Sequence, residues 1–134
     1  DMNNLSEKEI LELIEEAIVV SKNAYVNYSH FPVGAVLIDE KGRKFKGVNM
    51  ENSSFGLSLC AERNAISTAV TEGMKEMKII VVTGDTEGPI SPCGACRQVM
   101  SEFAGTDTII VLSNYKKDYK VYTMDELLPY SFKL

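Results

Sequence analysis

The sequence lacks the features that would point to a membrane or a polyanionic partner. None of its apolar runs approaches the ~20 residues that a transmembrane helix needs. Residues 1–10 are polar and acidic, without the positive and apolar segments of a secretory signal peptide. No block of lysine or arginine stands out, and 19 acidic against 14 basic residues give a formal net charge of −5. We therefore expect a cytoplasmic protein with no membrane association and no nucleic-acid partner.

Cysteine and histidine are both scarce. The chain has three cysteines and a single histidine, His30. Three cysteines cannot all pair within one chain, and in a reducing cytosol a C-x-x-C pair more often serves metal or redox chemistry than a structural disulfide. Residues 92–98, PCGACRQ, contain such a pair in Cys93 and Cys96. The cysteines are therefore the candidate metal or redox residues, and we assign no role to the lone histidine.

The rest of the composition is that of an ordinary globular protein. The 134 residues are 45% hydrophobic and 25% charged, which is enough for one domain with one core. No repeat, linker or low-complexity segment interrupts the chain. We expect a single catalytic domain over residues 1–134.

The hydrophobic periodicity predicts an α/β fold. A capping-box pattern at Ser6 and Glu9 precedes apolar residues at helical spacing, and later runs alternate as strands do. The predicted elements are a helix over 6–25, a hairpin over 33–49, a helix over 61–72, a strand over 78–84, a helix over 93–103, a strand over 108–113, and a short strand and a helix capped by Thr123. A strand–helix–strand order is typical of a parallel crossover. The expected architecture is one three-layer domain with a mixed sheet of about five strands and helices on both faces.

The three cysteines lie at predicted helix starts. Cys60 begins one helix and Cys93 another, and helix N-termini favour thiolate over thiol. Cys93 and Cys96, three residues apart, share one face of the first turn. Together with Cys60 they provide three soft ligands, one fewer than a closed structural zinc site has. An open fourth position is typical of a catalytic zinc.

Glu62, two residues after Cys60, indicates which chemistry the metal would serve. A carboxylate in this first turn that does not bind the metal can reach a water at the open position and move its proton. Zinc deaminases have this arrangement, with a glutamate two residues after the first ligand and a later P-C-x-x-C. A redox C-x-x-C would leave Glu62 and Pro92 unexplained. His30 is the candidate fourth ligand of a structural zinc, but a lone histidine is more often a loop or surface residue.

Five sequence blocks occur along nearly the whole chain in a specific order. They are YSHFPVGA (28–35), NMEN (49–52), CAERNA (60–65), SPCGACRQV (91–99) and ELLPYSF (126–132). In these blocks the chain closely resembles the cytidine deaminase family, in its small homotetrameric form with three cysteine ligands. The resemblance implies one Zn²⁺ per chain and hydrolysis of cytidine and 2′-deoxycytidine to uridine and 2′-deoxyuridine plus ammonia, in pyrimidine salvage. It also implies a homotetramer whose sites are completed by neighbouring subunits.

The resemblance further implies a role for each residue of the site. The implied zinc ligands are Cys60, Cys93 and Cys96, and the implied acid and base is Glu62. By this resemblance, Asn49 and Glu51 contact the ribose. The base is contacted by Phe31, the Ala61 N–H and the Ser91 carbonyl. Phe132 is implied to close the site, from a neighbouring subunit.

Charge balance at the metal adds a prediction about two arginines. Three thiolates around a dication leave a net charge of −1, which weakens the acidification of a bound water. Arg63 and Arg97 each follow a cysteine ligand, so we expect their guanidinium groups to donate hydrogen bonds to the thiolates and withdraw charge.

Two alternatives remain beside a cytidine deaminase. One is deamination of another cytosine compound, such as the antibiotic blasticidin S, on the same fold. The other is a non-catalytic zinc or thiol-redox module. Phe55 stands where many members of the family have tyrosine, and this departure bears on substrate fit rather than on the reaction.

Overall fold

The computed structural model describes residues 5–134. In chain order its elements are α1 (Glu7–Ser21), β1 (Val33–Asp39), β2 (Lys44–Val48), the 3₁₀ helix η2 (Phe55–Leu57), α2 (Ala61–Thr71), β3 (Met77–Gly84), α3 (Gly94–Phe103), β4 (Ala104–Asn114), β5 (Tyr119–Tyr122) and α4 (Met124–Leu127). Over this described stretch, no helix has the length and apolar character needed to cross a membrane. The assignment of all of residues 1–134 to one domain stays a prediction, and residues 1–4 lie outside the described part.

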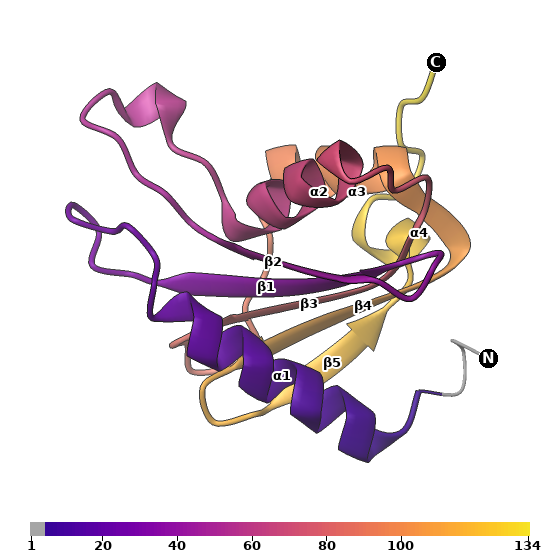
Figure 1. Cartoon of the computed structure of the whole chain (residues 1–134), viewed down its shortest axis with the longest axis horizontal. Coiled ribbons are helices and arrows are strands. Elements are labelled where there is room, and N and C mark those ends of the chain that lie inside the picture. The colour runs from indigo at the N-terminus through magenta and orange to yellow at the C-terminus, as the bar shows by residue number, and fades with distance from the viewer. Residues whose placement is uncertain (1–4) are drawn as a thin grey trace.

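The strands form one mixed sheet in the order β2-β1-β3-β4-β5. β3 and β4 are parallel and are connected through α3, whereas the other neighbours are antiparallel. Figure 1 shows α1 on one face of the sheet and α2, α3 and α4 on the other. The predicted three-layer α/β architecture with a mixed five-stranded sheet is confirmed.

The α1 layer is built by the predicted amphipathic stripe. The Ser6 hydroxyl accepts a hydrogen bond from Glu9 N (3.1 Å), and the Glu9 carboxylate accepts one from Ser6 N (3.0 Å), so the capping box forms. The buried face of the helix packs on one face of the sheet. Residues of this core are Ile10, Leu13, Ile14 and Ala17 of α1 with Val36, Ile79, Val81 and Val111 of the strands.

The predicted end of this first helix, near Tyr25, is wrong. The helix ends at Ser21, where the amides of the next residues form tight bonds to carbonyls three positions back. Tyr25 pairs instead with the segment after β2: its N–H donates to Asn49 O and its carbonyl accepts from Glu51 N. This long-range pairing draws the chain away from the helix axis, and in Figure 1 the loops after α1 and after β2 project from the same end of the sheet.

The other core lies between the sheet and the helices α2, α3 and α4. It contains Ala61, Ala65, Ile66 and Ala69 of α2, Met100 of α3 and Leu127 of α4, packed on alternate residues of β1, β3 and β4. The central strands therefore bury both faces, as their continuous apolar sequences predict. The starts of α2 and α3 are held side by side above the same end of the sheet.

Candidate active site

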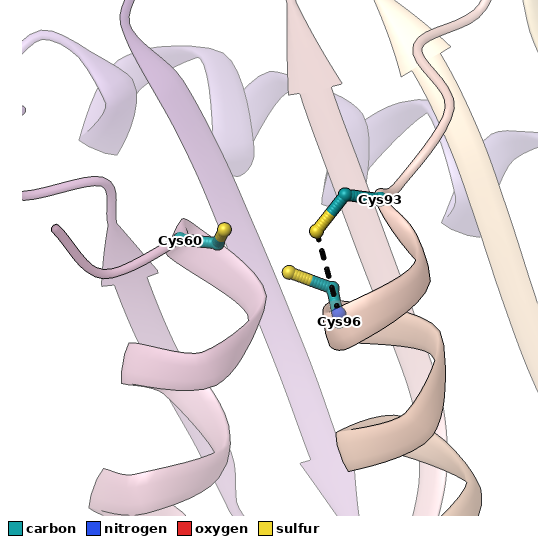
Figure 2. A group of neighbouring side chains, drawn as sticks. All are labelled: Cys60, Cys93 and Cys96. Carbon is teal, nitrogen blue, oxygen red and sulfur yellow. Dashed lines mark hydrogen bonds between the residues drawn. The ribbon is translucent and has the colours of Figure 1, made fainter. Parts of the chain in front are cut away.

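The three cysteine sulfurs meet between the starts of two helices. Cys60 is the N-cap of α2 and Cys93 the N-cap of α3, and Cys96 lies in the first turn of α3. Figure 2 shows the three side chains converging from the two helices. Their Sγ atoms all lie within 4.8 Å of one another. In the part of the chain that the structure describes, no carboxylate or imidazole joins this group as a fourth ligand.

The geometry and chemistry of the thiol cluster fit a zinc ion. A tetrahedral zinc bonds sulfur at about 2.3 Å, which places neighbouring sulfurs about 3.8 Å apart. Small movements of the cysteine side chains would be enough to bring the three sulfurs to this spacing. Three thiolates with an open fourth position match a catalytic site rather than a closed structural one. His30, to which we assign no role, is exposed and does not join the three cysteines in the described chain.

The cysteines differ in their tendency to ionise. Hydrogen bonding from Cys96, then from Cys93, and the charge of Arg63 lower the pKa of Cys60 to about 6. The same hydrogen bond to Cys60, together with burial, raises the pKa of Cys96 above its usual value. Of Cys60 and Cys96, Cys60 is therefore the thiol that ionises more readily, and Arg63 is the cation beside it.

Glu62 is a buried carboxyl next to this cluster. It lies in the first turn of α2 and is only 4% exposed. Burial raises the pKa of its carboxyl to about 6, and the charge of Cys60 adds to the rise. A carboxyl with a pKa near neutrality both accepts and returns a proton readily, as general acid–base catalysis requires.

A cavity of about 680 Å³ opens onto the cluster and Glu62. Its walls include every residue that the sequence assigns to zinc, to proton transfer and to the nucleoside, except Phe132: Phe31, Asn49, Glu51, Cys60, Ala61, Glu62, Ser91, Cys93 and Cys96. The arrangement places a buried carboxyl and three thiols in the wall of a pocket large enough for a small organic molecule.

Asn49 and Glu51 also hold the pocket wall together. The Asn49 side chain accepts from Val33 N (2.9 Å) and donates to Phe31 O (2.9 Å). The Glu51 carboxylate accepts from the backbone N–H groups of Tyr28 and Ser29 and from the Ser29 hydroxyl, and these bonds hold its pKa below the usual value. Their predicted contacts with a ribose stay predictions, but these internal bonds leave lone pairs on the Glu51 carboxylate for a further donor.

Comparison with known proteins identifies the family of this site. A model of the cytidine and deoxycytidylate deaminase zinc-binding region matches residues 7–113. Cytidine deaminase from Sporosarcina psychrophila is 45% identical over 124 residues, covering 92% of this chain and 91% of the relative. The chain belongs to the cytidine deaminase family. The predicted family and its zinc cofactor are thereby confirmed.

The fold and a more distant relative agree with this assignment. A crystal structure of cytidine deaminase from Burkholderia pseudomallei superposes with a TM-score of 0.87 at 45% identity, covering 90% of this chain and 97% of that one. A blasticidin-S deaminase from Bacillus cereus is 30% identical over 137 residues, covering 96% of this chain and 95% of the relative. Proteins similar to this chain over nearly its whole length are thus named for the deamination of cytidine and of blasticidin S.

In this family member Arg97 lies elsewhere than predicted. Its guanidinium donates to Pro92 O (3.0 Å), Leu127 O (2.6 Å) and the Ser91 hydroxyl (2.8 Å), and these bonds replace the expected contact with a thiolate. The carbonyls of the loop before α3 and of the end of α4 converge on it, which sequence spacing does not reveal. Arg97 therefore fixes the loop that leads into Cys93.

Phe132 lies outside the cavity of its own chain. Its side chain is 69% exposed, and its carbonyl accepts a hydrogen bond from Gln98 of α3 (3.1 Å). Sequence reasoning missed the part of the wall formed by the loop between β3 and α3, which includes Thr86, Glu87 and Ile90. Their signal was the turn-rich sequence DTEGPISP directly before the P-C-x-x-C.

Gly47 of β2 is predicted to control the zinc site through packing. A Cβ at this position would collide with backbone atoms of α2, Ala61 O and Ala65 N, beside Glu62. Gly47→Ala is therefore expected to displace the start of α2 and weaken zinc binding by about tenfold. Gly34→Ala is the matched control, because its Cβ would collide with Ala17 O of α1 on the other face. Competition titrations with a zinc-binding dye measure both, and equal zinc affinities for the two variants would contradict the expectation.

Proposed function

We propose that this protein is a zinc-dependent hydrolase that converts cytidine and 2′-deoxycytidine to uridine and 2′-deoxyuridine with release of ammonia. The observation that carries the proposal is the position of Glu62, a buried carboxyl beside three convergent thiols at the end of a cavity. Membership of the cytidine deaminase family supports the substrate class.

Each residue of the proposed site has a part in this reaction. One Zn²⁺ held by Cys60, Cys93 and Cys96 supplies Lewis-acid activation of water when bound. The Glu62 carboxylate accepts a proton from that water and delivers it to ring N3, so that C4 becomes electrophilic and oxygen adds there. Glu62 then carries the second water proton to the 4-amino group, the C4–N bond breaks, and ammonia leaves.

Backbone groups at the helix start support recognition of the base. Ala61 is the first residue of α2, so its N–H has no partner within the helix and is free to donate to a carbonyl such as O2 of cytosine. The Ser91 carbonyl, on the loop between β3 and α3 that also lines the cavity, is proposed to accept from the 4-amino group. Phe31 lines the cavity as an apolar face for the ring.

The charge of the cavity favours a nucleoside over a nucleotide. Glu51, Glu62 and Glu87 line it, and none of the wall residues in the described chain is lysine, arginine or histidine. A 5′-phosphate would meet like charge without a cation, which weakens binding by several kcal/mol. We expect kcat/KM for cytidine to exceed that for cytidine 5′-monophosphate by at least about 100-fold. Comparable values for the two substrates, measured by loss of cytosine absorbance, would refute the nucleoside assignment.

Blasticidin S is the second candidate substrate, because a relative that spans nearly the whole chain is named for its deamination. The polar wall built by Asn49 and Glu51 favours a ribose instead. Assays of blasticidin S beside cytidine separate the two functions. A higher kcat/KM for the antibiotic would replace the first proposal with the second.

We further propose that the protein works in the cytoplasm, in pyrimidine salvage, as a homotetramer. Exposed apolar side chains support an assembly: Phe55 (73% exposed), Leu57 (64%) and Phe132 (69%) lie on the surface. Sedimentation equilibrium is expected to give the mass of four chains. Phe132→Ala is expected to raise KM for cytidine because the residue would close a neighbouring site. A monomer that is fully active would contradict both expectations.

A further inference from the structure

Asn114 is a buried amide at the end of β4 that reaches into another loop. Its side chain is fully buried. Its Nδ2 donates to Thr86 O (3.1 Å) and Glu87 O (3.0 Å), and also to the Asp118 carboxylate (3.1 Å). Its Oδ1 accepts from Asp118 N (3.0 Å). All partners of the nitrogen are acceptors and the partner of the oxygen is a donor, which fixes the orientation of the amide.

The two carbonyls that Asn114 binds belong to the cavity wall. Thr86 and Glu87 line the cavity on the loop that runs from the end of β3 to Cys93. This loop is rich in glycine and proline, and Glu87 and Gly88 are exposed. Hydrogen bonds from β4 hold it at two points: Asn114 binds its first half, and the carbonyl of Ser113 accepts from Ile90 N (3.0 Å).

We propose that Asn114 is a positioning residue that sets the affinity of the site for its nucleoside by holding the Thr86–Glu87 wall in place. The residue itself neither lines the cavity nor belongs to the thiol cluster. Because the wall faces the substrate while zinc is held by α2 and α3, a displaced wall lowers affinity without removing the metal. The proposal rests on the proposed function.

The chemistry of an amide is needed at this position. Aspartate has the same shape and still accepts from Asp118 N, but its carboxylate would face two carbonyls and the Asp118 carboxylate. Asn114→Asp therefore keeps the bond from Asp118 N and loses all the bonds that Nδ2 donates, to the two loop carbonyls and to the Asp118 carboxylate. Asp118→Ala also removes the bond between Nδ2 and the carboxylate within the turn, but it leaves the bonds to Thr86 and Glu87. The pair separates positioning of the wall from stabilisation of the turn.

The test uses zinc-loaded full-length protein and measures zinc content, kcat and KM for cytidine, and the Kd of the product uridine by calorimetry. Asn114→Asp is expected to raise KM and the uridine Kd about tenfold, with kcat within about threefold and zinc still stoichiometric. Hydrogen exchange of the amides of residues 86–91 is expected to become faster, with those of α2 unchanged. Asp118→Ala is expected to lower Tm while leaving KM and Kd at their wild-type values.

Several results would overturn the proposal. One is an unchanged KM and uridine Kd in both Asn114→Asp and Asn114→Ala. Another is a rise of KM and uridine Kd in Asp118→Ala equal to that in Asn114→Asp. The third is failure of both Asn114 variants to fold, which would show that the residue serves the fold alone. Wild-type protein that leaves cytidine untouched would instead refute the proposed function. In that case, amide hydrogen exchange at residues 86–91 that is the same in Asn114→Asp as in wild type would still refute the claim that Asn114 holds this loop in place.

Discussion

Glu62→Gln is expected to lower kcat for cytidine by about 10³- to 10⁴-fold while the protein keeps its zinc. Glutamine has the same size and keeps a hydrogen-bonding side chain at this buried position, but it cannot accept and return a proton. The loss therefore falls on proton transfer, and zinc binding by the three thiolates is spared. Single-turnover kinetics with metal analysis of the same samples measures both quantities.

Glu87→Gln is the matched control for this prediction. Glu87 also lines the cavity, but it is exposed and lies on the loop between β3 and α3, outside the thiol cluster. We expect its kcat to stay within about threefold of wild type, since surface substitutions that leave the reacting groups in place have small effects. A Glu62→Gln protein that keeps more than a tenth of wild-type kcat would exclude Glu62 as the proton carrier.

Cys96→Ala is expected to abolish both zinc binding and activity. Cys96 is 1% exposed, and its Sγ is one of only three sulfurs in the cluster. Two thiolates hold zinc far more weakly than three, and zinc bound only by the folded state also stabilises that state. The Tm of the wild-type protein is therefore expected to fall on addition of a chelator, whereas the Tm of Cys96→Ala is expected to stay the same.

Ser101→Ala tests whether such effects come from the metal or from general disturbance of α3. Ser101 is buried on the same helix, and its hydroxyl donates to Gln98 O (2.8 Å). Its substitution is expected to lower Tm slightly, with zinc content and chelator sensitivity unchanged. If elemental analysis finds one zinc per chain in Cys96→Ala, then Cys96 is not a zinc ligand.

The features that sequence could predict are those set by neighbouring residues. The capping box at Ser6 and the apolar stripe after it locate α1, and the capping box at Thr123 locates α4. The continuous apolar runs locate β3 and the second half of β4. Cys60 and Cys93 were predicted to begin helices because each follows a loop, and both are N-caps. Local spacing thus brings the thiols and Glu62 to the ends of two adjacent helices.

The features that sequence missed depend on contacts between distant residues. The first helix stops early because Tyr25 pairs with the segment around Met50. Arg97 follows a cysteine but binds the carbonyl of Leu127, 30 residues away. In the sequence, Asn114 has the features of an ordinary strand end. Only the fold shows that its amide donates hydrogen bonds to the carbonyls of Thr86 and Glu87, which precede it by 28 and 27 positions. Each depends on how the layers pack, which periodicity does not encode.

Incubation of zinc-loaded protein with cytidine, with uridine and ammonia quantified together, tests the central claim most directly. We expect uridine and ammonia in equal amounts, with turnover lost on chelation and restored by one zinc per chain. Protein that carries one zinc per chain and leaves both cytidine and 2′-deoxycytidine unchanged would contradict the account.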